Sequence, residues 1–484
     1  AGIDAGENLG LRPLRELIQN SDDARSDRIA VRISDDSMVF SNDGLTLTQN
    51  PDGSEGGGTL DALMELDSGH KERDPDSSGH FGSGFRSSHL FSDDAHVNGE
   101  VILDGEPVRV RVVSKSHTTN LENLDTWDEF EVRGDQDRPK RSVRAGAAAD
   151  RQGVEFTFPW RKSPRNDKWE GMLWDKKRIA KLANDYAEEI PRILLGCRWI
   201  REAVLIVDVG GKKTSNMWVR DFNIEEYQDT GKSRVSMKHF VSKKAIKSSL
   251  LTVSDEEFTL DSEKEFILLC HRVSGRDENI APKAGYKPYC FLIIPTVPGD
   301  ELLPSYTPMA LAGKGVNAFG PLSFLPPHES RTKIKLDDSM KRAEIIWAMK
   351  ALETFSRDLL PLALAECLEM VENDSMSVTS MLSLLPKTRP DFWFSNRSQA
   401  HQSRESAMAW DAYTTKTNKT KFVPTSAGLV RPRDSVVVSG FGEDERSTIL
   451  KVLDSIGKAV MDDETAAILE SLSRESNKGG WGDN

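Results

Sequence analysis

The spacing of apolar residues predicts a fold that mixes helices and strands. Near the N-terminus, Leu14, Leu17 and Ile18 recur with a helical period, and with Ala24 they would form the apolar flank of one helix. The segments that follow are rich in β-branched residues or alternate apolar and polar residues, as strands do. Strands are therefore predicted at 28–33, 38–41, 95–103 and 108–113.

The rest of the chain continues this mixture, which predicts an α+β fold. Helices are predicted at 172–189, 339–371, 445–461 and 464–473, and strands at 203–209, 216–219, 266–272 and 289–295. Between two of these strands, Gly211-Lys212-Lys213-Thr214 looks like a phosphate-binding loop. Ile206 and Lys213 stand where that motif requires Gly and Ser or Thr, so the segment predicts a hairpin turn instead.

Composition places the chain among globular proteins without general affinity for nucleic acids. The chain has 484 residues, which allows about three domains. Charged residues make up 29% of it and the net charge is −13, which disfavours general binding to nucleic acids. The four cysteines are far apart and form no zinc or disulfide pattern, and no apolar run is long enough for a membrane span. We expect a cytoplasmic protein, and interpret the start without Met as a piece of a longer one.

The other face of the first helix carries candidate chemistry. Glu16, Asn20 and Asp23 are spaced i, i+4 and i+7, so they fall within one narrow sector. A solvated helix face more often mixes Lys with Glu at these spacings. A carboxylate, a carboxamide and a second carboxylate are oxygen ligands that suit a metal ion and a water molecule.

A glycine-rich segment forms the second motif. It has the pattern G-x-x-G-x-G and runs into apolar residues that predict a helix. Backbone N–H groups in such a loop can close on an anion, and a helix N-terminus adds a favourable dipole. The residues of this predicted anion-binding loop are Gly79, His80, Phe81, Gly82, Ser83, Gly84 and Phe85.

The order of these motifs resembles that of a known family. Glu-x-x-x-Asn-x-x-Asp-Ala at 16–24 is followed by Asn42-Asp43-Gly44 and then by the glycine loop, an order similar to that of the GHKL ATPases. This group includes gyrase B, the ninety-kilodalton heat-shock chaperone, histidine kinases and MutL. Within it, Glu16–Ala24 looks most like the sacsin-like branch. The resemblance implies a Bergerat ATP-binding α/β sandwich, with a mobile lid at about 50–79.

The resemblance also implies roles for residues of the first two motifs. Glu16 would be the general base, and Asn20 would hold Mg²⁺, with Asp23 and Ala24 beside the nucleotide. At the position where the family has an Asp that reads adenine, this chain has Asn42, and Asp43 is the alternative. An Asn carbonyl can still accept a hydrogen bond from the adenine amino group.

Gly153-Val154-Glu155-Phe156 resembles the last motif of the family, Gly-Thr-x-Phe. Val154 takes the place of Thr, so the hydroxyl contact to the nucleotide is missing.

Three basic side chains are candidates for phosphate contacts. Lys71, in the lid, either meets a phosphate or is solvated. Arg331 precedes the predicted long helix, where the family places a basic residue that reaches into the nucleotide site, and Lys333 is the alternate. A guanidinium suits the charge of a γ-phosphate because it can form bidentate hydrogen bonds. A surface loop of mixed charge remains the other interpretation of this segment.

The resemblance predicts three domains and an ATPase. Residues 1–160 would form the ATP-binding domain, 161–372 an α+β transducer-like domain, and 373–484 a mixed C-terminal segment like that of sacsin repeats. We predict Mg-dependent ATP binding with slow hydrolysis that closes the lid and rearranges the domains, as a chaperone-like module with a protein client, and a possible homodimer.

Two other functions stay open. One is the ATPase of a nucleic-acid-linked or antiviral defence system with a separate effector. The basic run at 138–144 favours nucleic acid as a partner, and the net charge opposes it. The other is a nucleotide-binding scaffold without turnover, which Asn42 and Val154 favour and Glu16 opposes.

Overall fold

The structure is a computed structural model, in which the chain divides into two compact units. The described residues are 10–44, 47–48, 85–103, 106–115, 129–134, 153–163, 173–197, 199–222, 231–243, 255–272, 289–296, 316–319, 358–373, 423–425, 428–431, 434–436, 438, 443–456 and 458–461. Unit one comprises Ala1–Glu226 and Ser236–Glu263, and unit two comprises Tyr227–Val235 and Lys264–Asn484. Strands β10 and β11 therefore contribute residues to both units.

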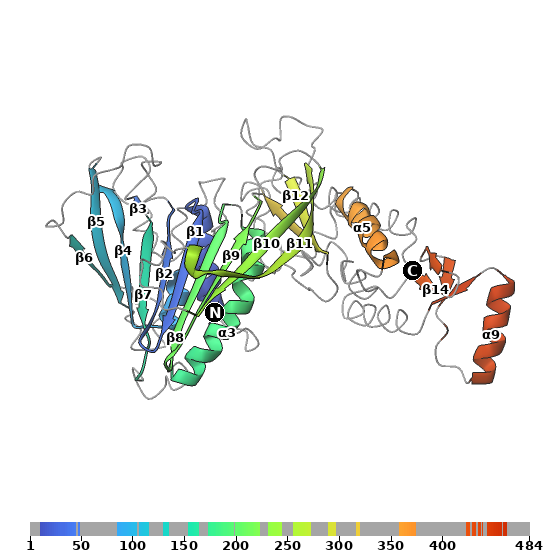
Figure 1. Cartoon of the computed structure of the whole chain (residues 1–484), viewed down its shortest axis with the longest axis horizontal. Coiled ribbons are helices and arrows are strands. Elements are labelled where there is room, and N and C mark those ends of the chain that lie inside the picture. Colours follow the sequence, from blue (N-terminus) through green and yellow to red (C-terminus); the bar gives the residue numbers. More distant parts are fainter. Residues whose placement is uncertain are drawn as a thin grey trace, which may run out of the picture. The chain divides into compact units, whose positions relative to one another are not determined.

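Unit one is built on a mixed β-sheet (Figure 1). Its strands are β1 (Arg28–Ser34), β2 (Ser37–Asn42), β3 (Leu47–Thr48), β4 (Asp94–Leu103), β5 (Glu106–Lys115), β6 (Glu129–Gly134), β7 (Val154–Pro159), β8 (Glu202–Val209), β9 (Lys212–Arg220) and most of β10 (Gly231–Ser242). They follow the order β10-β9-β8-β1-β2-β7-β4-β5-β6, with β3 beside β4. β1 pairs antiparallel with β2 and parallel with β8, so the sheet is mixed, which confirms the predicted α+β class.

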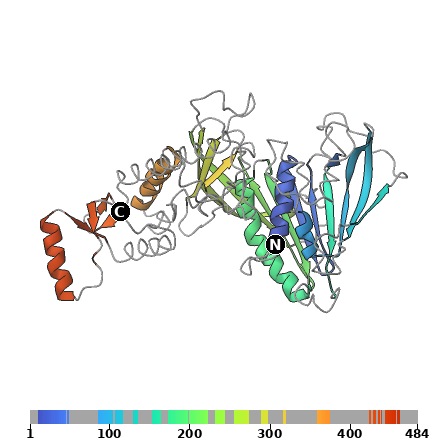
Figure 2. The same cartoon turned by 180° about the vertical axis from the view of Figure 1, so that it is seen from behind.

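Two helices cover one face of this sheet. They are α1 (Leu11–Asp23) and α3 (Lys176–Gly196), which lie side by side across the strands in Figure 2. α3 starts after Asp175, whose carboxylate accepts a hydrogen bond from the Arg178 amide at 2.8 Å and so caps the helix. A short 3₁₀ helix, η2 (Phe85–Leu90), lies against α1.

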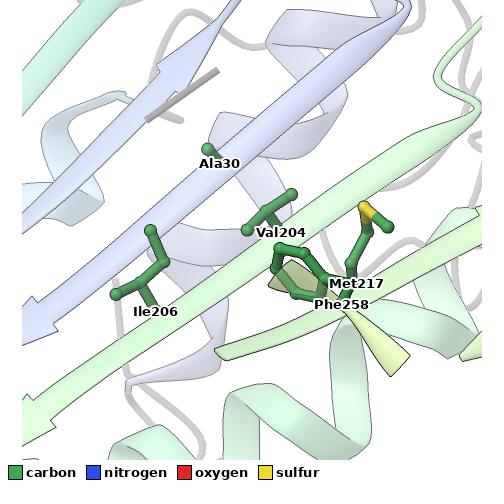
Figure 3. Close-up of a cluster of buried hydrophobic side chains, with 5 residues drawn as sticks. All are labelled: Ala30, Val204, Ile206, Met217 and Phe258. Atoms are coloured by element: carbon green, nitrogen blue, oxygen red, sulfur yellow. The ribbon is translucent and has the colours of Figure 1, made fainter. Parts of the chain in front are cut away.

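The strands of unit one bury side chains on both faces. On β1, Ile29, Val31 and Ile33 are fully buried and share one face by the alternation of a strand, while Ala30 faces the other way. An apolar cluster lies on the face of the sheet that carries Ala30 (Figure 3). It consists of Ala30, Val204, Ile206, Met217 and Phe258, and Phe258 comes from the segment between η5 (Asp255–Glu257) and β11.

Unit two contains an antiparallel group of strands and several smaller elements. The strands are β11 (Thr259–Arg272), β12 (Tyr289–Pro295) and β13 (Val316–Phe319), followed by α5 (Leu360–Glu372), the pair β14 (Val423–Thr425) and β15 (Gly428–Val430), and β16 (Ser435–Val436), α9 (Glu443–Ser455) and β17 (Ala459–Val460). Cys270 and Cys367 are buried free thiols. Within the described ranges, no helix is long and apolar enough to cross a membrane.

Where the predicted elements fall on described residues they are largely confirmed, with the following differences. α3 does not end at residue 189 but continues through Pro191 to Gly196. The segment after the glycine loop is a 3₁₀ helix rather than an α-helix. α9 ends at Ser455, before the predicted end at residue 461, because Ala459–Val460 pair with β16 instead. Strands β3, β6, β7, β10, β13, β14, β15, β16 and β17 were not predicted as strands. The helix predicted at 464–473 and the first part of that predicted at 339–371 lie outside the described residues.

The hairpin turn predicted near Gly211 is confirmed. β8 and β9 pair directly across it, with Val209 opposite Lys212. Gly210 and Gly211 form the two-residue turn, and both have positive φ angles, of 59° and 77°, which favour glycine. The three-domain division remains a prediction, although β8 and β9, which follow residue 160, pair in the same sheet as β1.

Candidate functional site

Two of the three polar residues predicted on the first helix have an intermediate exposure. Leu14, Leu17 and Ile18 are at most 2% exposed, which confirms these three residues of the predicted apolar flank. Ala24, the fourth, is the C-cap residue and is only partly buried. Glu16 and Asn20, on the same helix, are only partly buried. Asp23 is the last residue of α1, and its side chain lies outside the described part of the chain. The helix thus has the amphipathic form that its sequence predicts.

The N-terminal half of α1 is attached to α3 by two polar contacts. The Tyr186 hydroxyl donates to the carbonyl oxygen of Gly10 at 3.0 Å. Arg15 donates to Glu189 from Nη2 at 2.7 Å and from Nε at 3.1 Å. Burial raises the pKa of Tyr186 well above its ordinary value, so this hydroxyl stays a donor. These bonds fix the part of the helix that carries Glu16.

The C-terminal end of α1 lies against the turn that follows β2. The amide of Ala24 donates to the carbonyl oxygen of Asn20 at 3.0 Å and closes the helix. A Cβ atom on Gly44 would lie 2.7 Å from the Ala24 carbonyl oxygen and 2.4 Å from Ser26 Oγ. Only glycine permits this approach. The first motif and the Asn42-Asp43-Gly44 turn are therefore neighbours in space.

Asn42 and Asp43, the two candidates for contact with adenine, have different hydrogen-bond partners. Asp43 Oδ1 accepts hydrogen bonds from the backbone amides of Asp27 and Arg28, both at 2.9 Å, so this carboxylate holds the start of β1. Asn42 is 5% exposed, and its Oδ1 accepts from the Gly44 amide at 3.1 Å. Asn42 shares its sheet face with the buried Phe40, on the side that α1 covers. Asn42 therefore lies on the face that α1 covers, whereas the Asp43 carboxylate is bound to the start of β1.

The predicted last motif lies beside Asn42. In the pairing of β2 with β7, Asn42 is opposite Val154, which is 4% exposed. A Cβ atom on Gly153 would lie 2.1 Å from the Asn42 carbonyl oxygen, so this glycine also serves a close backbone approach. Three segments that are distant in sequence thus meet at one end of the strands.

The other predicted site residues cannot be placed. Lys71, Arg331, Lys333 and the glycines of the anion-binding loop lie outside the described residues, and Phe85 is described only by its backbone in η2. η2 lies against α1, so the end of the glycine loop comes to the same helix.

A buried arginine holds the segment after η2, and the sequence did not reveal it. Arg161 donates from Nε to Asp93 at 2.9 Å and from Nη2 to the carbonyl oxygen of His89 at 2.8 Å. The rings of Phe91, Trp160 and Trp174 pack together beside it. The end of β7 is therefore tied to the start of β4, immediately after η2.

Asp22, one residue before Asp23, links α1 to the segment after α3. Its Oδ1 accepts from the amides of Trp199 at 2.7 Å and Ile200 at 3.1 Å. Arg220 is fully buried nearby, over the ring of Phe222, with 5.1 Å from its guanidinium carbon to the ring centroid. Burial lowers the pKa of Arg220, and Cys197 and Asp22 oppose this effect. No local sequence pattern predicts these contacts.

Comparisons with known proteins give weak structural likenesses. No family model and no curated protein matches the chain. The ATPase region of Saccharomyces cerevisiae topoisomerase II bound to ICRF-187 (dexrazoxane) is 12% identical, with a TM-score of 0.26. The ATPase and transducer domains of DNA topoisomerase II from Balamuthia mandrillaris are 13% identical, with a TM-score of 0.27.

Both matches cover 44% of this chain, and they cover 58% of the yeast chain and 56% of the Balamuthia chain. The likeness therefore spans less than two thirds of either structure. TM-scores of this size carry no argument about fold or function, so the residues of the chain itself must support any functional proposal.

Proposed function

We propose that the chain binds Mg-ATP and hydrolyses it slowly, in a Bergerat-type site like that of the GHKL ATPases. One observation carries the proposal. The helix that bears Glu16 and Asn20 ends against Gly44, in the turn after Asn42, and Asn42 is opposite Val154. The three segments that resemble the family motifs therefore adjoin one another on one face of the sheet, as a shared ligand requires.

The side chains of α1 would supply the chemistry. Glu16 would orient the attacking water and accept its proton, and its partial exposure lets water reach it. Phosphoryl transfer depends mainly on positioning and charge, so no covalent nucleophile is needed. The amides of Gly82 and Gly84 would contact the phosphates, and Arg331 or Lys333 would add a cation.

The residues present fit a magnesium ion bound together with phosphates. Among the described side chains, no three His, Cys, Asp or Glu residues cluster as a metal site. Asn20 offers one amide oxygen on the partly exposed face of α1. Mg²⁺ keeps several waters and takes few protein ligands when it binds with a nucleotide, and there it would neutralise phosphate charge.

The output of this site would be mechanical. In our proposal the chain belongs to the sacsin-like branch, and nucleotide closes the lid at about 50–79 and rearranges the ATP-binding domain against the transducer-like domain. A chaperone-like module with a protein client, acting as a homodimer, would use this movement. The resemblance of 16–24 to the sacsin-like motif supports this assignment.

Replacing the general base tests the proposal. We expect Glu16→Gln to keep Mg-ATP affinity by calorimetry but to lose about 10²–10⁴ in the rate of phosphate release. Arg12→Ala, at an exposed position one turn earlier on α1, is the matched control and should keep the parent rate. A Glu16→Gln variant that hydrolyses ATP at the parent rate would exclude Glu16 as the base. A parent protein that binds Mg-ATP without turnover would be a scaffold.

A further inference from the structure

The turn after β2 fixes the orientation of one side-chain amide. Asn42 Oδ1 accepts from the amide of Gly44, two residues ahead, at 3.1 Å, which is the bond of an Asx turn. The Gly44 nitrogen can only donate, so it defines which end of the Asn42 amide is oxygen. The nitrogen Nδ2 is therefore the end of the amide that is directed away from the turn.

The surrounding backbone keeps this turn in place. Gly153 lies against the Asn42 carbonyl oxygen, and Gly44 lies against Ala24, in both cases closer than any Cβ atom would allow. Asp43 Oδ1 holds the amides of Asp27 and Arg28. Turning the Asn42 amide over would put Nδ2 against the Gly44 N–H, so that two donors would face each other at a residue that is only 5% exposed. The turn thus selects one orientation.

We propose that Asn42 presents an N–H donor to the base, so that the site prefers a 6-oxo purine nucleotide, such as ITP or GTP, to ATP. The inference rests on the proposed function, because it assumes that a purine nucleotide occupies this site. A carboxylate at this position would offer two acceptors, which suit the 6-amino group of adenine. The amide replaces the second acceptor with a donor, which suits the O6 atom of hypoxanthine or guanine.

The neighbouring residue does not reverse this preference. Val154, opposite Asn42, has no side-chain hydrogen-bonding group, and it is buried beside the amide. Of these two opposed side chains, Asn42 alone can form a hydrogen bond with the 6-substituent. Meeting the adenine amino group with Nδ2 would place two donors together, and an unsatisfied buried pair of this kind weakens binding by about tenfold.

Calorimetry with three nucleotides tests the proposal. Mg-ITP is the sharpest probe, since hypoxanthine carries O6 without the 2-amino group of guanine, and Mg-GTP and Mg-ATP complete the series. We expect the parent protein to bind Mg-ITP about tenfold more tightly than Mg-ATP. We expect Asn42→Asp to invert this order, because its second carboxylate oxygen accepts from the adenine amino group and repels O6.

The outcomes separate the two proposals. If the parent protein binds Mg-ATP as tightly as Mg-ITP or more tightly, the base preference is wrong and the proposed ATP-binding function stands. If none of the three nucleotides binds, the proposed function fails and the base preference fails with it. The comparison on the parent protein does not depend on whether Asn42→Asp folds, and melting of that variant by circular dichroism shows whether its affinities can be compared.

Discussion

The two ends of α1 are held in different ways. Near the N-terminal end, side chains of α3 reach the helix: the Tyr186 hydroxyl donates to Gly10, and Glu189 accepts from Arg15. At the C-terminal end, the Asp22 carboxylate accepts from the amides of Trp199 and Ile200, and in addition backbone meets backbone, since Gly44 lies against Ala24 without room for a Cβ atom. Glu16 lies between these two attachments.

Substitutions at the two ends of α1 should therefore affect stability in different ways. A side-chain contact can be weakened one hydrogen bond at a time, and solvent can partly replace what is lost at a half-exposed partner. A backbone contact at van der Waals distance has no such intermediate, because any added atom must move one of the two segments. We therefore expect abrupt effects at the C-terminal end and graded effects at the N-terminal end.

The largest effect should come from Gly44→Ala. The added Cβ would lie 2.7 Å from a backbone oxygen, the Ala24 carbonyl, which cannot rotate away. We expect a loss of about 3 kcal/mol in the free energy of unfolding, measured by urea denaturation, together with weaker nucleotide binding.

Gly231→Ala is the matched control for this substitution. In the described part of the chain, no heavy atom comes within 4 Å of a Cβ atom at that position. Its unfolding free energy should change by less than about 0.5 kcal/mol. An unchanged urea midpoint for Gly44→Ala would show that the turn can move away from α1, and the contrast between the two ends would then disappear.

A smaller effect should follow from Glu189→Ala. The Glu189 side chain is 6% exposed, whereas that of Arg15 is 29% exposed, so water can partly solvate the arginine once its partner is removed. We expect a loss of about 1–2 kcal/mol in the free energy of unfolding, below the value for a fully buried pair.

Two further variants isolate this pair. Glu188→Ala removes an exposed carboxylate next to it on α3 and should have little effect. Combining Glu189→Ala with Arg15→Gln gives a double-mutant cycle. The interaction free energy between the two residues should account for most of the stability lost in Glu189→Ala alone. Additive effects of the two changes would mean that the ion pair does not hold α1.

Much of the fold follows from local sequence patterns. β12 has the predicted bounds, and β1, β2 and β8 are within a few residues of theirs, because alternation and turn residues mark them clearly. The end of α3 could not be predicted this way. Pro191 normally ends a helix, but Ile193, Leu194 and Leu195 are buried beyond it, and their packing outweighs the lost backbone hydrogen bond.

The candidate site shows the same division between local and distant information. The polar face of α1 is a pattern within eight residues, so the sequence reveals it. The partners that fix this helix are 174 to 177 residues away, at Glu189, Tyr186 and Trp199, and no spacing in the sequence indicates them. The orientation of the Asn42 amide likewise depends on the folded turn, which the sequence alone does not determine.

The smallest effect should come from Tyr186→Phe. This change removes one hydroxyl and leaves the ring in its fully buried place on α3. The Gly10 carbonyl oxygen would lose the donor that lies 3.0 Å away. We expect a loss of about 1 kcal/mol in the free energy of unfolding at neutral pH, because one buried hydrogen bond is lost without a change in packing.

The pH dependence of this loss identifies its cause. Burial, with a contribution from Asp185, raises the pKa of Tyr186 in the folded protein well above its ordinary value of 10.0. The stabilisation from this residue is therefore complete below about pH 10, the unfolded-state pKa, and is lost as the pH rises toward the folded-state pKa. Between pH 8 and pH 10.5, urea denaturation should show that the parent protein loses more stability than Tyr186→Phe. The difference in the free energy of unfolding between the two proteins should therefore be smaller at pH 10.5. A parallel decline would mean that Tyr186 ionises as an exposed tyrosine does, and that the N-terminal end of α1 is not held by a buried hydroxyl.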